Sequence, residues 1–516
     1  MYLKQTKRNG RVYLSVMQNY RHEGKVRSKT VESIGYADEF ANRYDDPIAH
    51  FKAYVDELNE KARESDTPVH LTIARGAQIA TGETGSIQLG SAIALGYLDA
   101  LGIGRFFNER TPRQDPDAGL GRAVELLVTE RMLHAVPVHE TWSARAKFPR
   151  ACKMELSDVY CGFEQVAQSE RALVKRLNGR YETIHGPRAL DSVRLVLSNY
   201  VFPWPKESSS RGPDEMEGQD MARLWLAIDG NGIPLTYRIV PSDMTAERTL
   251  EAIDELKVET GARHITLVAA QLEGASTVVP RLLAQNDGFV LLIRASEMFP
   301  DQHAWVGDES GYALTRNGAF LIKSRVNSLA SRVSEVGGIA AYRPAPPNVE
   351  VREVALKAAH GKAGQSFVIA TNELVSSNAA IFNIYRELWR VHEPFQVITA
   401  DFIAAPYPVD ARVHLRAHFA ICYAAFFALR MLREDMGWQG NAAQVADALV
   451  HMEGAFLDQN WYLFNYRTPV TDNIQRAVGI EVGRRLLSRG DIRSIIARVH
   501  RNALHQDMRG KESRMQ

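Results

Sequence analysis

The fold class is decided by the stretch Leu224-Trp-Leu-Ala-Ile-Asp-Gly-Asn-Gly-Ile-Pro-Leu-Thr-Tyr-Arg-Ile-Val240. Two apolar runs, 224–228 and 237–240, flank Asp229-Gly230-Asn231-Gly232, and apolar runs joined by such a turn predict a β-hairpin. Further strand-like runs stand at 189–197, 265–269 and 289–293, with a helical pattern at 246–259. Strands interleaved with helices predict an α/β core.

The stretches outside this core have other patterns. Residues 1–36 alternate polar and apolar and predict a small β arm, and helical spacing follows over 48–61. The predicted domains are a basic N-terminal β arm (1–36), a helix and linker (37–66), a helical DNA-binding domain (67–180), the first part of the core (181–294), a β-rich insertion (295–362), the second part of the core with a long helix at 378–398 (363–405), and a helical C-terminal region with a basic tail (406–516).

Composition indicates an ordinary folded protein, with 516 residues of which 45% are hydrophobic and 24% charged. The longest apolar run, Phe419–Leu429, is shorter than the ~20 residues of a membrane span, so we expect a buried helix and no membrane partner. The N-terminus has no apolar segment after its charges, which predicts a cytoplasmic protein. Cys152, Cys161 and Cys422 lack disulfide or zinc spacing and are expected in the core.

Positive charge gathers at the two ends of a chain whose net charge is +1. The N-terminal group has a single acid among its residues, Glu23, and consists of Lys4, Lys7, Arg8, Arg11, Arg21, Lys25, Arg27 and Lys29. The C-terminal group begins at Arg484 and Arg485 and holds nine Lys or Arg against three acids. Basic ends suit contacts with nucleic-acid phosphates, or they form an ordinary solvated surface.

The predicted helix at 378–398 contains the sequence Ile384-Tyr-Arg-Glu-Leu-Trp-Arg-Val-His-Glu-Pro-Phe-Gln-Val-Ile-Thr399. Positions 385, 388, 392 and 399 are three, four and seven residues apart, which places them on one helix face. The stretch resembles the signature helix of bacterial insertion-sequence DDE transposases, in which these positions hold Tyr, Arg, Glu and Lys.

Other stretches resemble the same transposase group, in the same order along the chain. They are Tyr2–Tyr36, Gly232–Arg238 followed by Thr249-Leu250, Asn460–Tyr462, and Gly483–Ile492. The resemblance covers essentially the whole chain. It implies an RNase H-like mixed-sheet core in which three carboxylates hold two Mg²⁺ or Mn²⁺ ions for phosphoryl transfer. It also implies double-stranded transposon ends as the partner, and a homodimer.

The catalytic positions depart from the family's pattern. Asp191 matches the first carboxylate and is the one expected metal ligand, although Val193 replaces the Thr that accompanies it. Ala270 stands where the second carboxylate should follow the strand at 265–269. His392 replaces the third carboxylate, and its nitrogen suits zinc or iron better than magnesium.

Further departures affect the signature helix and a loop. Tyr385 matches the family, but Leu388 replaces Arg and Thr399 replaces the phosphate-binding Lys. Pro394 predicts a kink in the helix. The loop after Asp191, basic in the family, here contains Asp214, Glu215, Glu217 and Asp220 without a basic residue among them.

Three hypotheses follow. The leading one is a DNA-binding protein of transposase descent that has lost strand cleavage and transfer. The second is an active transposase that uses Asp191, Glu273 and either Glu393 or His392 as divergent ligands. The third is an oligomeric interaction protein that does not bind DNA.

Overall fold

The structure is a computed structural model. It describes residues 1–8, 10–22, 25–41, 43–44, 46–64, 76, 85–111, 115–134, 136–204, 220–270, 272–315, 319–328, 350–359, 366–395, 410–438, 442–457 and 460–499. The chain forms two compact units, Met1–Ala77 and Gln78–Gln516. Each unit is described by itself.

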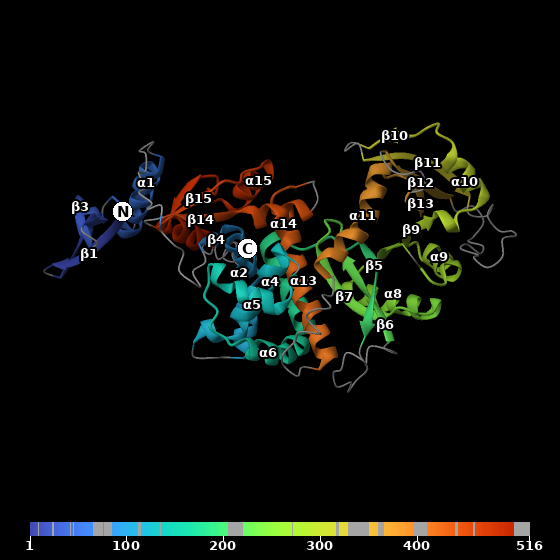
Figure 1. The fold of residues 1–516 in the computed structure, drawn as a ribbon, viewed down its shortest axis with the longest axis horizontal. Coiled ribbons are helices and arrows are strands. Elements are labelled where there is room, and N and C mark those ends of the chain that lie inside the picture. Colours follow the sequence, from blue (N-terminus) through green and yellow to red (C-terminus); the bar gives the residue numbers. More distant parts are fainter. Residues whose placement is uncertain are drawn as a thin grey trace. The chain divides into compact units, whose positions relative to one another are not determined.

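The first unit is an antiparallel sheet followed by a helix (Figure 1). The sheet has the order β1 (Tyr2–Arg8), β2 (Arg11–His22), β3 (Lys25–Tyr36). The 3₁₀ helix η1 (Ala37–Phe40) and the helix α1 (Pro47–Glu64) come next. This confirms the β arm predicted for residues 1–36 and the helix predicted for 48–61.

The chemistry of α1 explains where it begins and how it packs. The Asp46 carboxylate accepts hydrogen bonds from the Ile48 and Ala49 amides at 3.0 Å, which satisfies amides that have no partner within the helix. Along α1, Val55 is buried, as are Leu14 and Val16 of the sheet. The Tyr54 hydroxyl donates to the Glu32 carboxylate at 3.0 Å, which ties α1 to β3.

The second unit contains a nine-stranded mixed sheet with the order β10-β11-β12-β13-β9-β8-β5-β6-β7. Strands β5, β6 and β7 are antiparallel neighbours, whereas β8 and β9 run parallel to β5. The strands are β5 (Ser192–Trp204), β6 (Asp220–Ile228), β7 (Pro234–Pro241), β8 (His264–Ala269), β9 (Gly288–Arg294), β10 (Ala313–Leu314), β11 (Phe320–Ser328), β12 (Glu350–Ala358) and β13 (Ser366–Thr371).

Helices pack on both faces of this sheet. One face carries Leu195 and Leu267, which cluster with apolar side chains of α8 (Ala246–Thr260) and α9 (Ala275–Ala284). The elements η5 (Ala295–Glu297) and α10 (Pro300–Gly307) follow β9 in the chain. The other face carries Val196 and Val268, which cluster with α11 (Asn378–Phe395) and α13 (Ala411–Asp435). Neighbouring strand residues therefore alternate between two cores.

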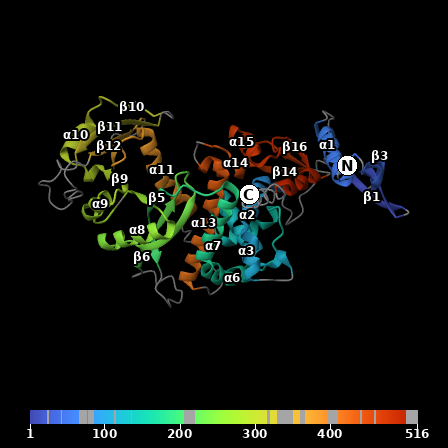
Figure 2. The ribbon, with the colours of Figure 1, turned by 180° about the vertical axis from the view of Figure 1, so that it is seen from behind.

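A helical module surrounds α13, which contacts α2, α4, α6 and α7 (Figure 2). Its elements are β4 (Ser86–Gln88), α2 (Leu89–Leu101), α3 (Ile103–Arg110), η2 (Pro116–Ala118), α4 (Leu120–Leu133), α5 (Val138–Ala144), η3 (Arg145–Lys147), α6 (Leu156–Gln168) and α7 (Glu170–His185). Among the described helices, α13 alone is long and apolar enough to pass for a membrane span, with a mean hydropathy of 1.3 over an 18-residue stretch. However, 94% of that stretch is buried inside the protein. It is a core helix, as predicted from Phe419–Leu429.

The C-terminal part adds a four-stranded sheet with the order β16-β15-β14-β4. It is built from β14 (Glu453–Leu457), β15 (Trp461–Phe464), β16 (Leu486–Ser488) and the earlier β4, with α14 (Ala442–His451), α15 (Pro469–Val478) and a helical stretch over 489–499. Strands in a region predicted to be wholly helical correct that expectation, since β14 pairs with β4, more than 350 residues away in sequence, and β15 pairs with β14.

Several local predictions are confirmed, with one correction. The turn at 229–232 joins β6 to β7, and Gly232 has φ +84°, a conformation that favours glycine. The helix predicted at 378–398 is described from Asn378 to Phe395, and 396–398 lie outside the described residues. Of the three cysteines, Cys422 is buried as expected, but Cys161 is exposed.

Candidate functional site

The candidate site lies where the parallel pairing of β5 with β8 ends. Leu197 of β5 pairs with Ala269 of β8, so the residues that follow them, Ser198 and Ala270, lie at the same end of the strand pair. In open α/β sheets, ligands bind beyond the carboxyl ends of parallel strands. Ser198 and Ala270 are therefore the residues to examine for metal or phosphate chemistry.

Ser198 lies in an irregularity of β5. The register between β5 and β6 shifts between Leu197 and Val201, which leaves 198–200 outside the regular ladder. The Ser198 side chain is buried, and its hydroxyl accepts a hydrogen bond from the Tyr200 amide at 3.0 Å. Bulges of this kind often re-aim a side chain beside a functional site. The sequence analysis missed Ser198 because it ended this strand at Leu197.

Ala270 belongs to the core beneath α11. It is 2% exposed and clusters with Val196, Val268 and the α11 residues Ile381 and Tyr385. The helix contacts β5, β8 and β9. Tyr385 is buried, with its ring 5.5 Å from that of Phe367, so it packs in the core beneath α11.

Asp191 lies at the opposite end of β5, which corrects the expectation that it shares a metal site with the Ala270 position. Its carbonyl accepts from the His264 amide, at the start of β8. Asp191 precedes Ser198 by seven residues, or about 23 Å of strand at about 3.3 Å per residue. The Asp191 side chain is 79% exposed and lies 3.7 Å from Arg263. One metal ion cannot bind both Asp191 and a residue at position 270.

The structure describes some of the remaining predicted site residues and not others. Glu273 is exposed and stands three residues after Ala270, directly before α9. Val193 is fully buried against the α8–α9 side of the sheet. His392 and Glu393 belong to the backbone of α11, but their side chains, like that of Leu388, lie outside the described residues, and Thr399 lies outside them altogether.

The described residues offer no ready metal site. Within the ranges that the structure describes, no three His, Cys, Asp or Glu residues are grouped as metal ligands would be. Mg²⁺ requires near-octahedral oxygen ligation with carboxylates, whereas the residues that follow the paired segments of β5 and β8 offer a hydroxyl and a methyl group. These residues do not fit a pair of Mg²⁺ or Mn²⁺ ions.

The basic residues of the first unit differ in their availability. Lys4, Lys7, Arg27 and Lys29 are exposed, and the side chains of Arg8, Arg21 and Lys25 lie outside the described part. Arg11 is engaged within the unit, because its guanidinium bonds to Asp38 at 2.6 and 2.8 Å and to Glu39 at 3.0 Å. These bonds raise the pKa of Arg11 and lower that of Asp38.

The C-terminal basic group is described only in part. Arg484 forms an ion pair with Glu481 at 2.7 Å, whereas Arg485 is exposed. The predicted acidic loop residues Asp214, Glu215 and Glu217 lie outside the described residues, and Asp220 is exposed at the start of β6.

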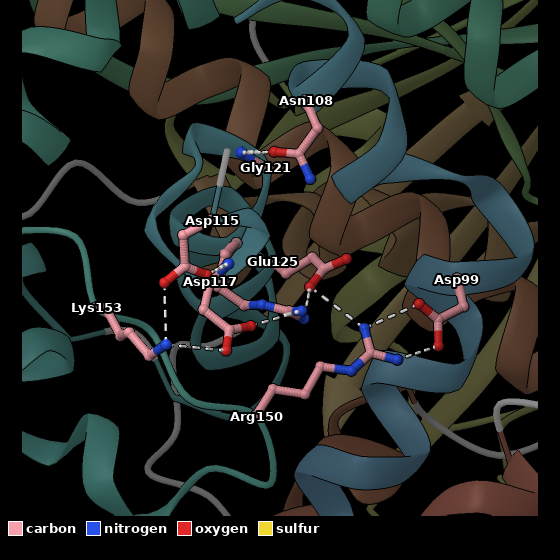
Figure 3. A network of polar contacts seen from close by, with 9 residues as sticks. Asp99, Asn108, Asp115, Asp117, Gly121, Glu125, Arg150 and Lys153 are labelled. Atoms are coloured by element: carbon pink, nitrogen blue, oxygen red, sulfur yellow. Dashed lines mark hydrogen bonds and ion pairs between the residues drawn. The ribbon is translucent and has the colours of Figure 1, made fainter. Parts of the chain in front are cut away.

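A charged network that the sequence analysis did not predict joins α2, α4 and the segment after η3 (Figure 3). Arg150 bonds to both Asp99 and Glu125, the latter at 3.2 Å, and Arg122 bonds to Glu125 at 2.7 Å. Burial raises the pKa of Glu125, although the charges of Arg150 and Arg122 oppose this. Because each of these acids has an arginine partner, we interpret the network as a structural connection between the helices.

Close helix packing accompanies this network. The Gly121 amide donates to the Asn108 side chain at 3.0 Å, as Figure 3 shows. A Cβ on Gly121 would lie 2.1 Å from the Gly104 carbonyl oxygen, so that α3 and α4 can approach this closely only through glycine. No spacing rule in the sequence announces such an approach.

A second polar cluster connects the end of α13 with α2 and α7. Asp435 accepts from the Tyr97 hydroxyl at 2.8 Å and contacts His185 Nε2 at 2.7 Å. Glu434 accepts from the Tyr181 hydroxyl at 2.6 Å. Burial opposes the charge on His185, but the hydrogen bond and charge of Asp435 outweigh it and raise the pKa of His185.

Comparison with known families identifies the first unit. Residues 3–69 match the model of a family described as IS1634 family transposase, N-terminal domain. The matched range lies inside the compact unit Met1–Ala77. Among curated proteins, none matches this chain.

The fold and the family match both bear on the class of protein. The chain is a mixed α/β protein with an antiparallel N-terminal sheet, and that sheet lies in the range that matches the transposase family. The match supports an insertion-sequence transposase.

Proposed function

We propose that this chain is a DNA-binding protein of an insertion sequence, descended from a DDE transposase, that has lost strand cleavage and transfer. The observation on which the proposal chiefly depends is the pairing of Leu197 with Ala269. It brings Ser198 and Ala270 to one end of β5 and β8 without a carboxylate on either.

The sheet topology supports an RNase H-like core. In the order β7-β6-β5-β8-β9, three antiparallel strands are followed by two strands parallel to β5. The helices α8 and α9 connect β7 to β8 and β8 to β9. The helix α11, with the signature stretch, contacts β5, β8 and β9, on the face where Ala270 is buried.

The chemistry of phosphoryl transfer requires more than this fold. Two metal ions activate the attacking oxygen and stabilise the leaving oxygen, and each ion needs carboxylate oxygens. Ser198 offers one hydroxyl, already accepting from Tyr200, and Ala270 offers no donor atom. We therefore propose that Mg²⁺ and Mn²⁺ do not bind productively in this chain.

The family match supports retention of DNA binding. Residues 3–69 match the N-terminal domain of a transposase family, and exposed Lys and Arg side chains stand on its strands. Transposon ends are the expected duplex, and a homodimer is the expected assembly. Loss of the metal ligands in the second unit leaves this surface of the first unit unchanged.

An active transposase with divergent ligands is the second candidate, but the geometry disfavours it. Asp191 lies by the start of β8, whereas Glu273 follows its end, and β8 spans six residues, or about 20 Å. Asp191 and Glu273 therefore cannot bind a common ion. An oligomeric protein without DNA binding is the third candidate.

Two measurements on the full chain separate these candidates. Calorimetric titration with Mg²⁺ and with Mn²⁺ should give no binding isotherm under the proposal, whereas saturable binding that Asp191→Ala abolishes would establish the divergent enzyme. Filter binding to duplex DNA should weaken steeply from about 50 to about 200 mM salt, because contacts with phosphates release counterions. Absence of binding at the lowest salt would favour the third candidate.

A further inference from the structure

The strands β2 and β3 continue beyond β1 as a two-stranded ribbon. Pairing between β1 and β2 ends at Tyr2 with Met17, whereas β2 and β3 stay paired from Gln18 with Lys29 to His22 with Lys25. The segments 18–22 and 25–29 thus form a ribbon of about 17 Å at about 3.4 Å per residue. We call these two segments the ribbon.

The charged residues of the ribbon are all of one sign, which is positive. Its sequence contains Arg21, Lys25, Arg27 and Lys29, and the connecting residue Glu23 is the only acid between 18 and 29. Such a density of positive charge on a projecting element favours a polyanion as its partner.

Two of these cations share one face. Arg27 and Lys29 are two residues apart in β3, which places both side chains on the same side of the strands, and both are exposed. The opposite face at this level carries Asn19 and Ser28, which are cross-strand partners joined by a hydrogen bond of 2.6 Å. At the level of these pairs, the ribbon therefore carries two cations on one face and uncharged polar groups on the other.

The other described cations of the sheet do not extend this face. Lys4 pairs with Ser15 of β2. Ser15 and Gln18 are three residues apart in this strand, so their side chains lie on opposite sides of the sheet. Lys4 therefore lies on the side opposite to the Arg27–Lys29 face. Arg11 is held by Asp38 and Glu39. Lys7 pairs with Val12, six residues from Gln18 along β2, or about 20 Å away.

We infer that the ribbon enters the major groove of duplex DNA, with its Arg27–Lys29 face directed at the phosphates. The inference rests on the proposed DNA binding and adds the element and residues that make the contact. Two strands about 4.8 Å apart fit a groove about 12 Å wide, and two-stranded ribbons are a known form of groove binder. Arg27 provides a planar fork and Lys29 a point charge for phosphate oxygens.

The test compares two double variants of the full chain. R27A/K29A removes the cationic face, and R43A/K52A removes one Arg and one Lys that are exposed elsewhere in the same unit. Binding of a fluorescein-labelled duplex, taken from the DNA beside the reading frame, is measured by anisotropy over a salt series. A shuffled duplex of equal length serves as the second probe.

Loss of two phosphate contacts should reduce the slope of log K against log salt by about 1.8, at about 0.9 per contact. The expected result is this reduction for R27A/K29A on both duplexes and none for R43A/K52A. R27Q/K29Q, which removes the charge but keeps a polar side chain, should behave as R27A/K29A, and thermal unfolding should show that each variant is folded.

Three outcomes would overturn the inference, and they are distinguishable. A wild-type chain that binds with a steep slope unaltered in R27A/K29A would refute the ribbon and leave the proposed function intact. Equal reductions in both double variants would show diffuse charge in place of a defined contact. A wild-type chain that binds neither duplex would refute the proposed function as well.

Discussion

Single side chains determine what the ends of β5 and β8 can bind. Ser198 and Ala270 lie at that end, both buried, while Asp191 stands at the far end of β5, exposed beside Arg263. A buried carboxylate is costly unless a cation compensates it. Without carboxylates at 198 and 270, this position lacks the ligands that a metal ion would require. It also lacks the buried negative charges that a metal ion would have to compensate.

Restoring the two carboxylates should make stability depend on metal. In S198D/A270D, two buried acids without a cation should lower the melting temperature in EDTA, and Mn²⁺ should raise it again, because an ion that binds the folded state stabilises it. Differential scanning fluorimetry with and without Mn²⁺ measures this. S198N/A270N should show the loss without the recovery, and a comparable Mn²⁺ response in the wild type would contradict our assignment.

The pair of His185 and Asp435 should make stability depend on pH. The folded-state pKa of His185 is raised, so its stabilising charge is fully present below the unfolded pKa of about 6.5 and is lost as pH rises through the folded value. His185→Gln should therefore cost on the order of 1 kcal/mol near pH 6 and less above pH 8 or so. Urea unfolding across pH checks this, and a constant difference would contradict it.

At the scale of elements, the charged network holds a helical module together. Arg150 reaches Asp99 of α2 and Glu125 of α4 from a segment after η3. Asp99 and Glu125 are about nine-tenths buried, and Arg150 contributes charge to both, although Glu125 is also bonded to Arg122. The network thus fixes α2 and α4 with respect to each other.

Removal of that cation should be strongly destabilising. Arg150→Met takes the cation from the buried Asp99 and leaves Glu125 with Arg122 alone, and it should lower the free energy of unfolding by about 3 kcal/mol. Lys153→Met removes an exposed cation from Asp115 and should cost far less, because solvent screens an exposed ion pair. Chemical denaturation of the three proteins measures both values, and equal losses would show that burial of the network contributes little.

Sequence patterns predicted many elements but not their ends. Runs at 224–228, 265–269 and 289–293 lie in β6, β8 and β9, because buried strands are continuous apolar segments. The strand predicted at 189–197 extends to Trp204, since Ser198 and Asn199 interrupt the apolar pattern without ending β5. That error directed attention to Asp191, and only the register of β5 with β8 identifies Ser198.

At the scale of the whole molecule, the proposed DNA binding and the proposed loss of metal ligands belong to different units. The range that matches a transposase N-terminal domain lies in Met1–Ala77, and the sheet with Ser198 and Ala270 lies in Gln78–Gln516. Substitutions at the metal positions therefore leave the first unit intact. A chain of this design would occupy transposon ends without cutting them.

A strand-cleavage assay tests this claim most directly. The full chain is incubated with labelled duplex DNA from either side of its reading frame, in Mg²⁺ and in Mn²⁺, at a concentration where anisotropy shows the DNA to be bound. We predict bound DNA with no nicked or joined product in either metal. Metal-dependent product that disappears in the Asp191→Ala variant would contradict the account.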